Sequence, residues 1–211
     1  PQHPVMAKKN SDQISLFPET LYEYHVLLSP GDTIIDDVDK LKQQLHEMIG
    51  IPDHNLRSLA HVTLMKIEGY DDLNLPAHIK AAVAGERKFS VKLHGYGCFE
   101  AGDERSLYLK IEDPAPIDNI AALIKPGSRR KPKKTDRQIS ILDKPGQKPK
   151  IPSITPHVTI ARNIPTADYE RITDFSPFEY EGEWVCDRIM IRRRVAGSGK
   201  TFSPYATVKL A

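Results

Sequence analysis

One tetrapeptide pattern occurs twice in this chain and constrains its fold more than any other feature. His61-Val62-Thr63-Leu64 and His157-Val158-Thr159-Ile160 lie 96 residues apart, whereas the composition predicts about 0.06 such tetrapeptides by chance. Because side chains alternate along a strand, each copy places an imidazole and a hydroxyl on one face and two apolar side chains on the other. The spacing therefore indicates a duplicated chain whose two copies meet across a pseudo-two-fold axis.

The hydrophobic pattern around the two copies predicts alternating strands and helices. Strands are expected at Tyr22–Leu28, Leu59–Ile67, Phe89–Phe99, Leu107–Ile111 and His157–Ala161, and near Cys186–Arg194 and Ala206–Leu210. Helices are expected at Thr33–Ile49, Pro76–Ala84, Pro116–Ile124 and Ala167–Thr173. This order predicts an α+β fold with mainly antiparallel pairing.

The length and the charge distribution predict how the chain is divided. The 211 residues suffice for a single bilobal domain over residues 21–211, preceded by a tail at residues 1–20. A basic, Pro-rich loop insertion is expected at residues 125–151, since residues 125–150 carry a net charge of +8 and the rest of the chain −6. This loop is either a flap that attracts a polyanion such as RNA or a solvated insertion.

The cysteines and the apolar runs indicate a cytoplasmic protein. Cys98 and Cys186 are far apart and lack the CxxC spacing, which excludes a zinc knuckle or a disulfide scaffold and favours two small buried side chains. No apolar run approaches the roughly 18 residues of a membrane helix, and no secretion signal is recognisable. We expect a monomer without a membrane span.

The repeated pattern suits acid and base catalysis on a phosphodiester. One neutral histidine, His61 or His157, can take a proton from an attacking oxygen while the other, protonated, gives one to the departing oxygen. The hydroxyls of Thr63 and Thr159 can donate to the non-bridging phosphate oxygens. A metal site is the competing interpretation, but each copy offers one good ligand and no Asp, Glu or Cys at ligand spacing. The sequence therefore predicts a reaction without metal or cofactor.

These residues resemble the two motifs of the 2H phosphoesterase superfamily, which includes bacterial 2'-5' RNA ligase and cyclic phosphodiesterase proteins. The second copy matches over Thr155-Pro156-His157-Val158-Thr159-Ile160-Ala161-Arg162, and Gly95-Tyr96-Gly97-Cys98-Phe99 resembles the glycine-containing strand between the motifs. The resemblance covers roughly residues 21–210. It implies a bilobal fold in which two related sheets with outer helices form a cleft around the motifs. It also implies a substrate with a 2',3'-cyclic phosphate, a 2'-5' linkage or a related cyclic phosphodiester.

The chain departs from the family pattern in two places. The basic loop replaces a compact helical stretch, and Lys66 stands where an apolar residue is commoner. The resemblance implies that Arg162, five residues after the second histidine, binds phosphate. By strict alternation Lys66 and Arg162 face away from the histidines, so they reach the phosphate only if each strand ends or bulges there. The alternative for Lys66 is an exposed cation at a strand end.

Other strands carry weaker candidates. Arg192, Arg193 and Arg194 alternate between faces, so at least one could meet phosphate, unless they only keep an edge strand soluble. Phe99 and Tyr205, and also Tyr96 and Phe202, are candidates to stack on a nucleobase, although strand aromatics more often belong to the core. The remaining histidines are expected to be structural or exposed: His3, His25, His46, His54, His78 and His94.

The sequence thus predicts a metal-independent phosphodiesterase or 2'-5' RNA ligase that acts on RNA or a cyclic nucleotide. Its catalytic residues are His61, His157, Thr63 and Thr159, and its substrate-binding residues are Arg162, Tyr205, Lys66 and Phe99. Which histidine is the base stays open at this point. The alternative is an RNA-binding module of the same fold whose catalysis is incidental or lost.

Overall fold

The computed structural model describes residues 20–70, 73–125 and 155–211, and their strands form two four-stranded antiparallel sheets. Sheet A has the order β2-β1-β7-β8 and comprises Leu21–Leu28 (β1), Val62–Tyr70 (β2), Arg188–Val195 (β7) and Ser203–Lys209 (β8). Sheet B has the order β5-β4-β3-β6 and comprises Phe89–Ala101 (β3), Glu104–Ile111 (β4), His157–Pro165 (β5) and Glu181–Cys186 (β6). The α+β class and the paired antiparallel sheets confirm the prediction.

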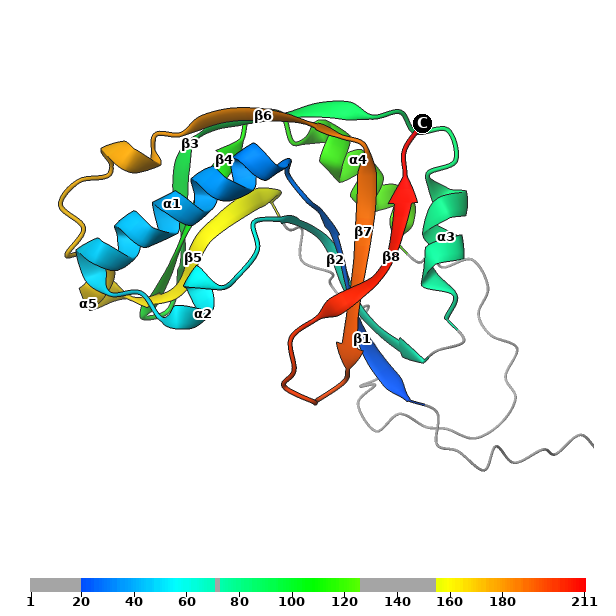
Figure 1. Ribbon diagram of the computed structural model, residues 1–211, viewed down its shortest axis with the longest axis horizontal. Coiled ribbons are helices and arrows are strands. Elements are labelled where there is room, and N and C mark those ends of the chain that lie inside the picture. The colour runs from blue at the N-terminus through cyan, green and yellow to red at the C-terminus, as the bar shows by residue number, and fades with distance from the viewer. Residues whose placement is uncertain (1–19, 71–72, 126–154) are drawn as a thin grey trace, which may run out of the picture.

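The helices pack across the two lobes. Asp32–Ile49 (α1) follows a strand of sheet A but packs against β5 and β6 of sheet B, where Asp53–Leu56 (α2) joins it. Conversely, Ala115–Ile124 (α4) follows a strand of sheet B and packs against β2, and Leu75–Ala82 (α3) packs against β8. Thr166–Tyr169 (α5) and the 3-10 turn Ser176–Phe178 complete the described elements. Figure 1 shows the two lobes with α1 lying over sheet B and α3 beside sheet A.

The two lobes are built from segments that resemble one another. Among the described elements, β1-α1-α2-β2 and β4-α4-β5 each lead from a strand through helix to a strand that carries one copy of the tetrapeptide; β5 begins at His157, and β2 begins at Val62, directly after His61. The strands β2 and β5 are the edge strands of their sheets and contact one another where the lobes meet (Figure 1). The apolar residues of each copy, Val62 and Leu64 in one and Val158 and Ile160 in the other, are buried in the core.

Several expected elements differ from the observed ones. The second half of the expected helix Ala167–Thr173 is not helical, and α2 and β6 were not expected as separate elements. The sequence segment Cys186–Arg194 contains the end of β6 and most of β7, which lie in different sheets. Cys186 is buried and Cys98 is half-buried, so only one of the two is enclosed as expected. The tail at residues 1–19 and most of the basic loop, residues 126–154, lie outside the described residues.

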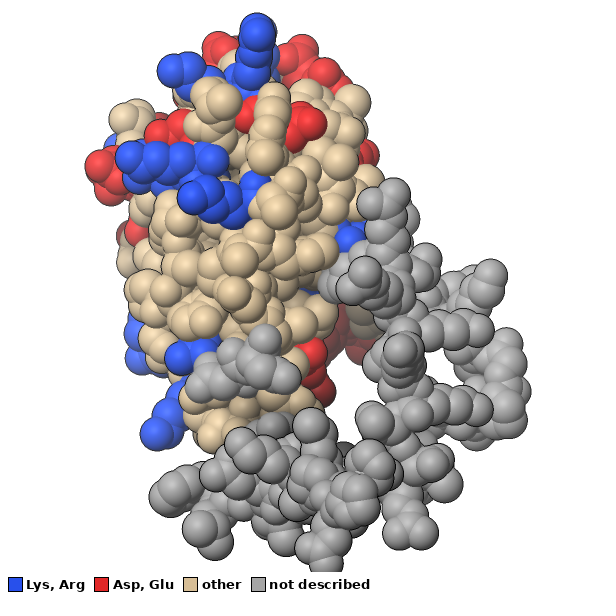
Figure 2. Space-filling view, turned by 90° about the vertical axis from the view of Figure 1, so that its right-hand side faces the viewer, with Lys and Arg blue, Asp and Glu red and all other residues tan. Residues whose placement is uncertain are grey.

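The face of the molecule at the α3 side carries little charge in its middle. In Figure 2 the acidic and basic side chains of this view lie mainly along its margins, with both signs close together at the upper end. No helix among the described residues has the length and apolar character needed to cross a membrane.

Candidate active site

The two histidines are held by the same contact. The Nδ1 atom of His61 lies 2.7 Å from the carbonyl oxygen of Leu59, and the Nδ1 atom of His157 lies 2.7 Å from that of Thr155. A carbonyl oxygen can only accept, so each Nδ1 carries a hydrogen and donates it. In the neutral ring, Nε2 is therefore the atom with the free lone pair and can take a proton, and in the protonated ring Nε2–H can give one. The repeat is thus preserved down to the tautomer of each imidazole.

A bulge follows each His-x-Thr. In β2, Thr63 pairs with Leu27 and Met65 with Val26, so Leu64 has no partner, and both Leu64 and Met65 are buried. In β5, Thr159 pairs with Tyr108 and Ala161 with Leu107, so Ile160 has no partner, and both Ile160 and Ala161 are buried. The extra core residue reverses the alternation after it.

The bulges turn Lys66 and Arg162 toward the face of Thr63 and Thr159. Lys66 pairs with His25, which lies two residues from Leu27, the partner of Thr63, and so on the same face. Arg162 is exposed and follows the buried Ala161. The sequence required a strand end or a bulge for Lys66 and Arg162 to share the face of the threonines, and the structure has a bulge before both.

His25 is a third histidine of the site that the sequence reasoning treated as structural or exposed. Its side chain is only 7% exposed, and its Nε2 atom lies 2.9 Å from Oγ1 of Thr63. Its ring meets that of His61 edge to face, with centroids 5.0 Å apart. The alternation of β1 gave no signal for this role, because a single His in a strand is common and its partner is 38 residues away.

His157 lies instead in an aromatic setting. Its ring centroid is 4.9 Å from that of Phe99 and 5.1 Å from that of Tyr108, and these two rings stack at 4.2 Å. Tyr108 lies across Gly97, where an added Cβ would come within 2.5 Å of the phenol ring. The glycine between the motifs thus leaves room for the ring that supports His157. Phe99, a predicted substrate-binding residue, lies in this group.

The environments of the three imidazoles differ in charge. Burial lowers the pKa of His61 below its ordinary value of 6.5, and Lys66, Arg192 and Arg162 lower it further, while the bond to Leu59 opposes the shift. Burial also lowers the pKa of His157, again opposed by its carbonyl contact, and among the described residues no cation adds to that shift. Within the part of the chain that the structure describes, Lys66, Arg192 and Arg162 therefore act on His61 and not on His157.

His25 and Lys66 respond to the same charges. Burial, then His61 and the neighbouring cations, lower the pKa of His25 to about 3, so its ring is neutral at physiological pH. Burial and the charge of Arg162 lower the pKa of Lys66, which Glu23 partly offsets. Because Arg162 of β5 acts on groups of β1 and β2, the structure brings the two copies of the motif to one region.

The other predicted residues of β7 and β8 are divided between the faces of sheet A. Arg192 pairs with His25 and lies on the histidine face, whereas Arg193 pairs with Tyr24. Tyr205 packs with that opposite face: its ring lies 5.8 Å from that of Tyr24 and 4.0 Å from the Arg193 guanidinium. The structure therefore does not bring Tyr205 to the histidines. Phe202 lies there instead, with its ring 5.5 Å from that of His25.

Two buried polar side chains hold the backbone of the motifs. The Asn55 amide donates to the Arg162 carbonyl at 3.1 Å and accepts from the Arg162 N–H at 3.0 Å, so it takes the place of a neighbouring strand. The Lys42 ammonium, fully buried in α1, donates to Asp39 at 2.8 Å and to the carbonyl of Ser58, three residues before His61. Neither residue was singled out from the sequence.

A model of the 2'-5' RNA ligase superfamily matches residues 30–198 of this chain. The chain belongs to this superfamily. The match spans both copies of the motif, Lys66 and Arg162. No curated protein sequence matches the chain.

Solved structures share the fold of this superfamily member at low sequence identity. E. coli LigT in its apo form gives a TM-score of 0.55 with 13% identity over 90% of this chain and 98% of LigT. LigT complexed with 3'-AMP gives 0.56 with 12% identity over 92% and 99%. A crystal structure of a phosphoesterase gives 0.54 with 13% identity over 92% and 99%. These matches show the LigT-like arrangement of two antiparallel sheets.

The donor set of the site suits an anion better than a metal ion. The described residues contain no group of three or more His, Cys, Asp or Glu side chains placed to hold a metal. The cations Lys66, Arg162 and Arg192, which act on His61, would also repel one.

Proposed function

We propose that this superfamily member is a metal-independent phosphodiesterase that opens 2',3'-cyclic phosphates or cleaves 2'-5' linkages by two-histidine acid-base catalysis. The observation that supports it most is the matched pair of imidazoles, each with Nδ1–H donated to the carbonyl two residues earlier and Nε2 left free. E. coli LigT forms complexes with phosphate and with 3'-AMP, in keeping with a nucleotide substrate.

We assign the base to His61 and the acid to His157. Burial and then the cations Lys66, Arg192 and Arg162 lower the pKa of His61, which favours its unprotonated Nε2, whereas among the described residues only burial lowers the pKa of His157. In hydrolysis, Nε2 of His61 takes a proton from water, whose oxygen bonds to phosphorus. The bond from phosphorus to one ribose oxygen breaks, and Nε2–H of His157 protonates that oxygen. In ligation a ribose hydroxyl takes the place of water: Nε2 of His61 takes its proton, its oxygen bonds to phosphorus, the bond from phosphorus to one oxygen of the cyclic phosphate breaks, and Nε2–H of His157 protonates that oxygen.

Thr63 and Thr159 hold the non-bridging oxygens, and Lys66 and Arg162 supply positive charge to the anionic substrate. In the His25 tautomer with hydrogen on Nε2, the ring donates to Thr63, whose own O–H is then free to donate to the phosphate. Phe99 and Phe202, rather than Tyr205, are the rings placed to border the base or the ribose.

Turnover of nucleoside 2',3'-cyclic phosphates in EDTA tests this function. We expect activity that survives chelation and falls about a hundredfold or more in His61→Ala and in His157→Ala. His78→Ala, which changes another histidine on α3, is the matched control and should retain full activity. A protein that only binds RNA would give no turnover with any variant, which would contradict the proposal.

A further inference from the structure

A row of basic groups crosses sheet A beside the catalytic residues. Lys66 of β2 pairs with His25 of β1, and His25 pairs with Arg192 of β7, so their side chains lie on one face. Arg162 joins them from β5, since its charge acts on His25 and on Lys66. We call Lys66, Arg162 and Arg192 the basic triad.

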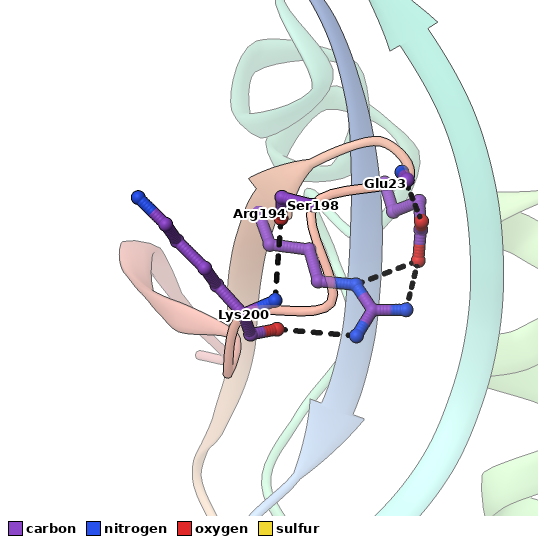
Figure 3. A network of polar contacts seen from close by, with 5 residues as sticks. Glu23, Arg194, Ser198 and Lys200 are labelled. Atoms are coloured by element: carbon purple, nitrogen blue, oxygen red, sulfur yellow. Dashed lines mark hydrogen bonds and ion pairs between the residues drawn. The ribbon is translucent and has the colours of Figure 1, made fainter.

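The triad is not neutralised by the carboxylates around it. Glu23, whose charge acts on Lys66, binds Arg194 through its Oε2 atom at 2.8 and 2.6 Å and accepts the Gly197 N–H through Oε1 (Figure 3). Arg194 is further held by the Lys200 carbonyl. Among the described residues, no carboxylate lies within ion-pair distance of Lys66, Arg162 or Arg192.

Arg192 also has an N–H group without a hydrogen-bond partner among the described residues. One Nη2–H goes to the Phe202 carbonyl, while the Nε atom is buried and has no hydrogen-bond partner within the described part of the chain. A buried N–H without a partner is unfavourable, and a guanidinium binds phosphate well through two parallel donors. Arg192 is thus prepared for an anion that the protein itself does not supply.

The triad is offset along sheet A from the row of Thr63. Its row on β1 is at His25, two residues from Leu27, the partner of Thr63, which is about 7 Å along a strand. This separation is of the order of that between neighbouring phosphates of a ribonucleotide. A pocket of about 250 Å³ adjoins the row and is lined by Glu23, Tyr24, Lys66, Ile67, Glu68 and Phe202.

We propose that the basic triad binds a second phosphate of the substrate, the 5'-phosphate of the nucleoside that carries the reacting phosphate. This inference rests on the proposed function and narrows its substrate class. The preferred substrate is then the 3' end of an RNA chain, or a 5'-phosphorylated nucleotide, and not a nucleoside cyclic phosphate alone. The pocket beside Phe202 accommodates the part of the substrate that continues beyond the 5'-phosphate.

Binding of two product analogues tests the second site without requiring turnover. Calorimetry with adenosine 3',5'-bisphosphate and adenosine 3'-monophosphate should show the bisphosphate binding about tenfold or more tightly. Arg192→Gln and Lys66→Gln should each move this ratio toward one. Arg193→Gln, the same change on the other face of β7, should leave the ratio as it is. Equal affinities in the native protein, or a ratio that both triad variants preserve, would overturn the inference.

Kinetics distinguish the origin of the phosphate. The kcat/KM for adenosine 2',3'-cyclic phosphate should rise when the nucleotide carries a 5'-phosphate and when it ends a dinucleotide, but not when free inorganic phosphate is added. A rate that rises with free phosphate would overturn the inference, because the site would then take a separate anion. Absent turnover together with a retained preference for the bisphosphate would end the proposed function and leave the second site established.

Discussion

The imidazoles of His61 and His157 make the same backbone contact but have different neighbours. His61 shares its surroundings with His25 and three cations, whereas His157 is bordered by Phe99 and Tyr108. The repeat therefore supplies two rings with the same backbone contact, and the surrounding side chains distinguish them. The proposed assignment of His61 as the base rests on this difference in charge.

The pH dependence of activity should report this difference. The acidic limb of a bell-shaped kcat/KM profile reports the base, since His61 must lose its proton to act. Its lowered pKa puts that limb below the ordinary histidine value of 6.5. Lys66→Gln removes a neighbouring cation, raises the pKa of His61 and should move the acidic limb to higher pH while the basic limb stays in place. A shift of the basic limb alone would reverse the assignment of base and acid.

His25 should act on catalysis as a positioning residue through Thr63. His25→Leu removes the donor to the Thr63 hydroxyl and should lower kcat about tenfold with a smaller change in KM. His25→Gln retains an N–H that can reach the same oxygen and should recover most of the lost kcat. Equal losses in the two variants would show that the residue only fills space.

The same residue should make stability depend on pH. The unfolded state takes a proton on His25 near pH 6.5, whereas the folded state does so only near 3, so stability is full above 6.5 and is lost as the pH falls. Between pH 7 and pH 5 the unfolding free energy of the native protein should fall by about 2 kcal/mol more than that of His25→Gln. Urea unfolding at the two pH values measures the difference, and equal losses in the native protein and His25→Gln would show that folding does not lower the pKa of His25.

At the scale of the element, the bulges decide what each strand can present. A regular strand would send Lys66 and Arg162 to the face opposite Thr63 and Thr159. One extra buried residue in each strand, Leu64 or Ile160, places hydroxyl and cation together. In a regular strand, residues two apart lie on the same face. Across each bulge the spacing on one face becomes three, as from Thr63 to Lys66 and from Thr159 to Arg162.

Asn55 should be needed to hold the second bulged strand. Asn55→Ala leaves the N–H and carbonyl of Arg162 without partners and should destabilise the fold by about 2 kcal/mol and lower activity. Asn55→Asp can still accept from the Arg162 N–H but cannot donate to the Arg162 carbonyl, so this variant should also be less stable and less active than the native protein. Asn119→Ala, which removes an exposed bond to Glu86, is the control and should cost less than about 0.5 kcal/mol. Equal effects at the two asparagines would contradict this role.

The sequence predicts the strands and helices that show a hydrophobic periodicity, but it does not predict the features that depend on contacts between distant residues. The strands carrying the two motifs and the long helix α1 follow from apolar spacing, and α1 begins within a residue of the expected Thr33. The four-residue α2 is too short to show a period, so the role of Asn55 could not be predicted. The His25 side chain reaches the Thr63 hydroxyl only once β1 and β2 are in register. The sequence indicates that a bulge is needed to bring Lys66 and Arg162 to the site. It does not show where the bulges lie, because Leu64 and Ile160 look like ordinary core residues in a sequence.

At the scale of the whole molecule, the exchange of helices joins the two lobes. The helix α1 leaves sheet A and covers sheet B, and α4 leaves sheet B and covers sheet A. The cores therefore depend on one another, and the edge strands β2 and β5 are kept in contact where the lobes meet (Figure 1). A site shared between two sheets requires this rigidity, because acid and base must face the same phosphorus.

Histidine-selective NMR during titration with adenosine 3'-monophosphate tests most directly whether the two imidazoles face a single phosphate. The account predicts that the ring signals of His61 and His157 shift together along one saturation curve, with one nucleotide bound per chain. Thr63→Val and Thr159→Val should weaken both shifts equally. Signals that follow two separate curves, or a shift in only one of the two rings, would contradict the account.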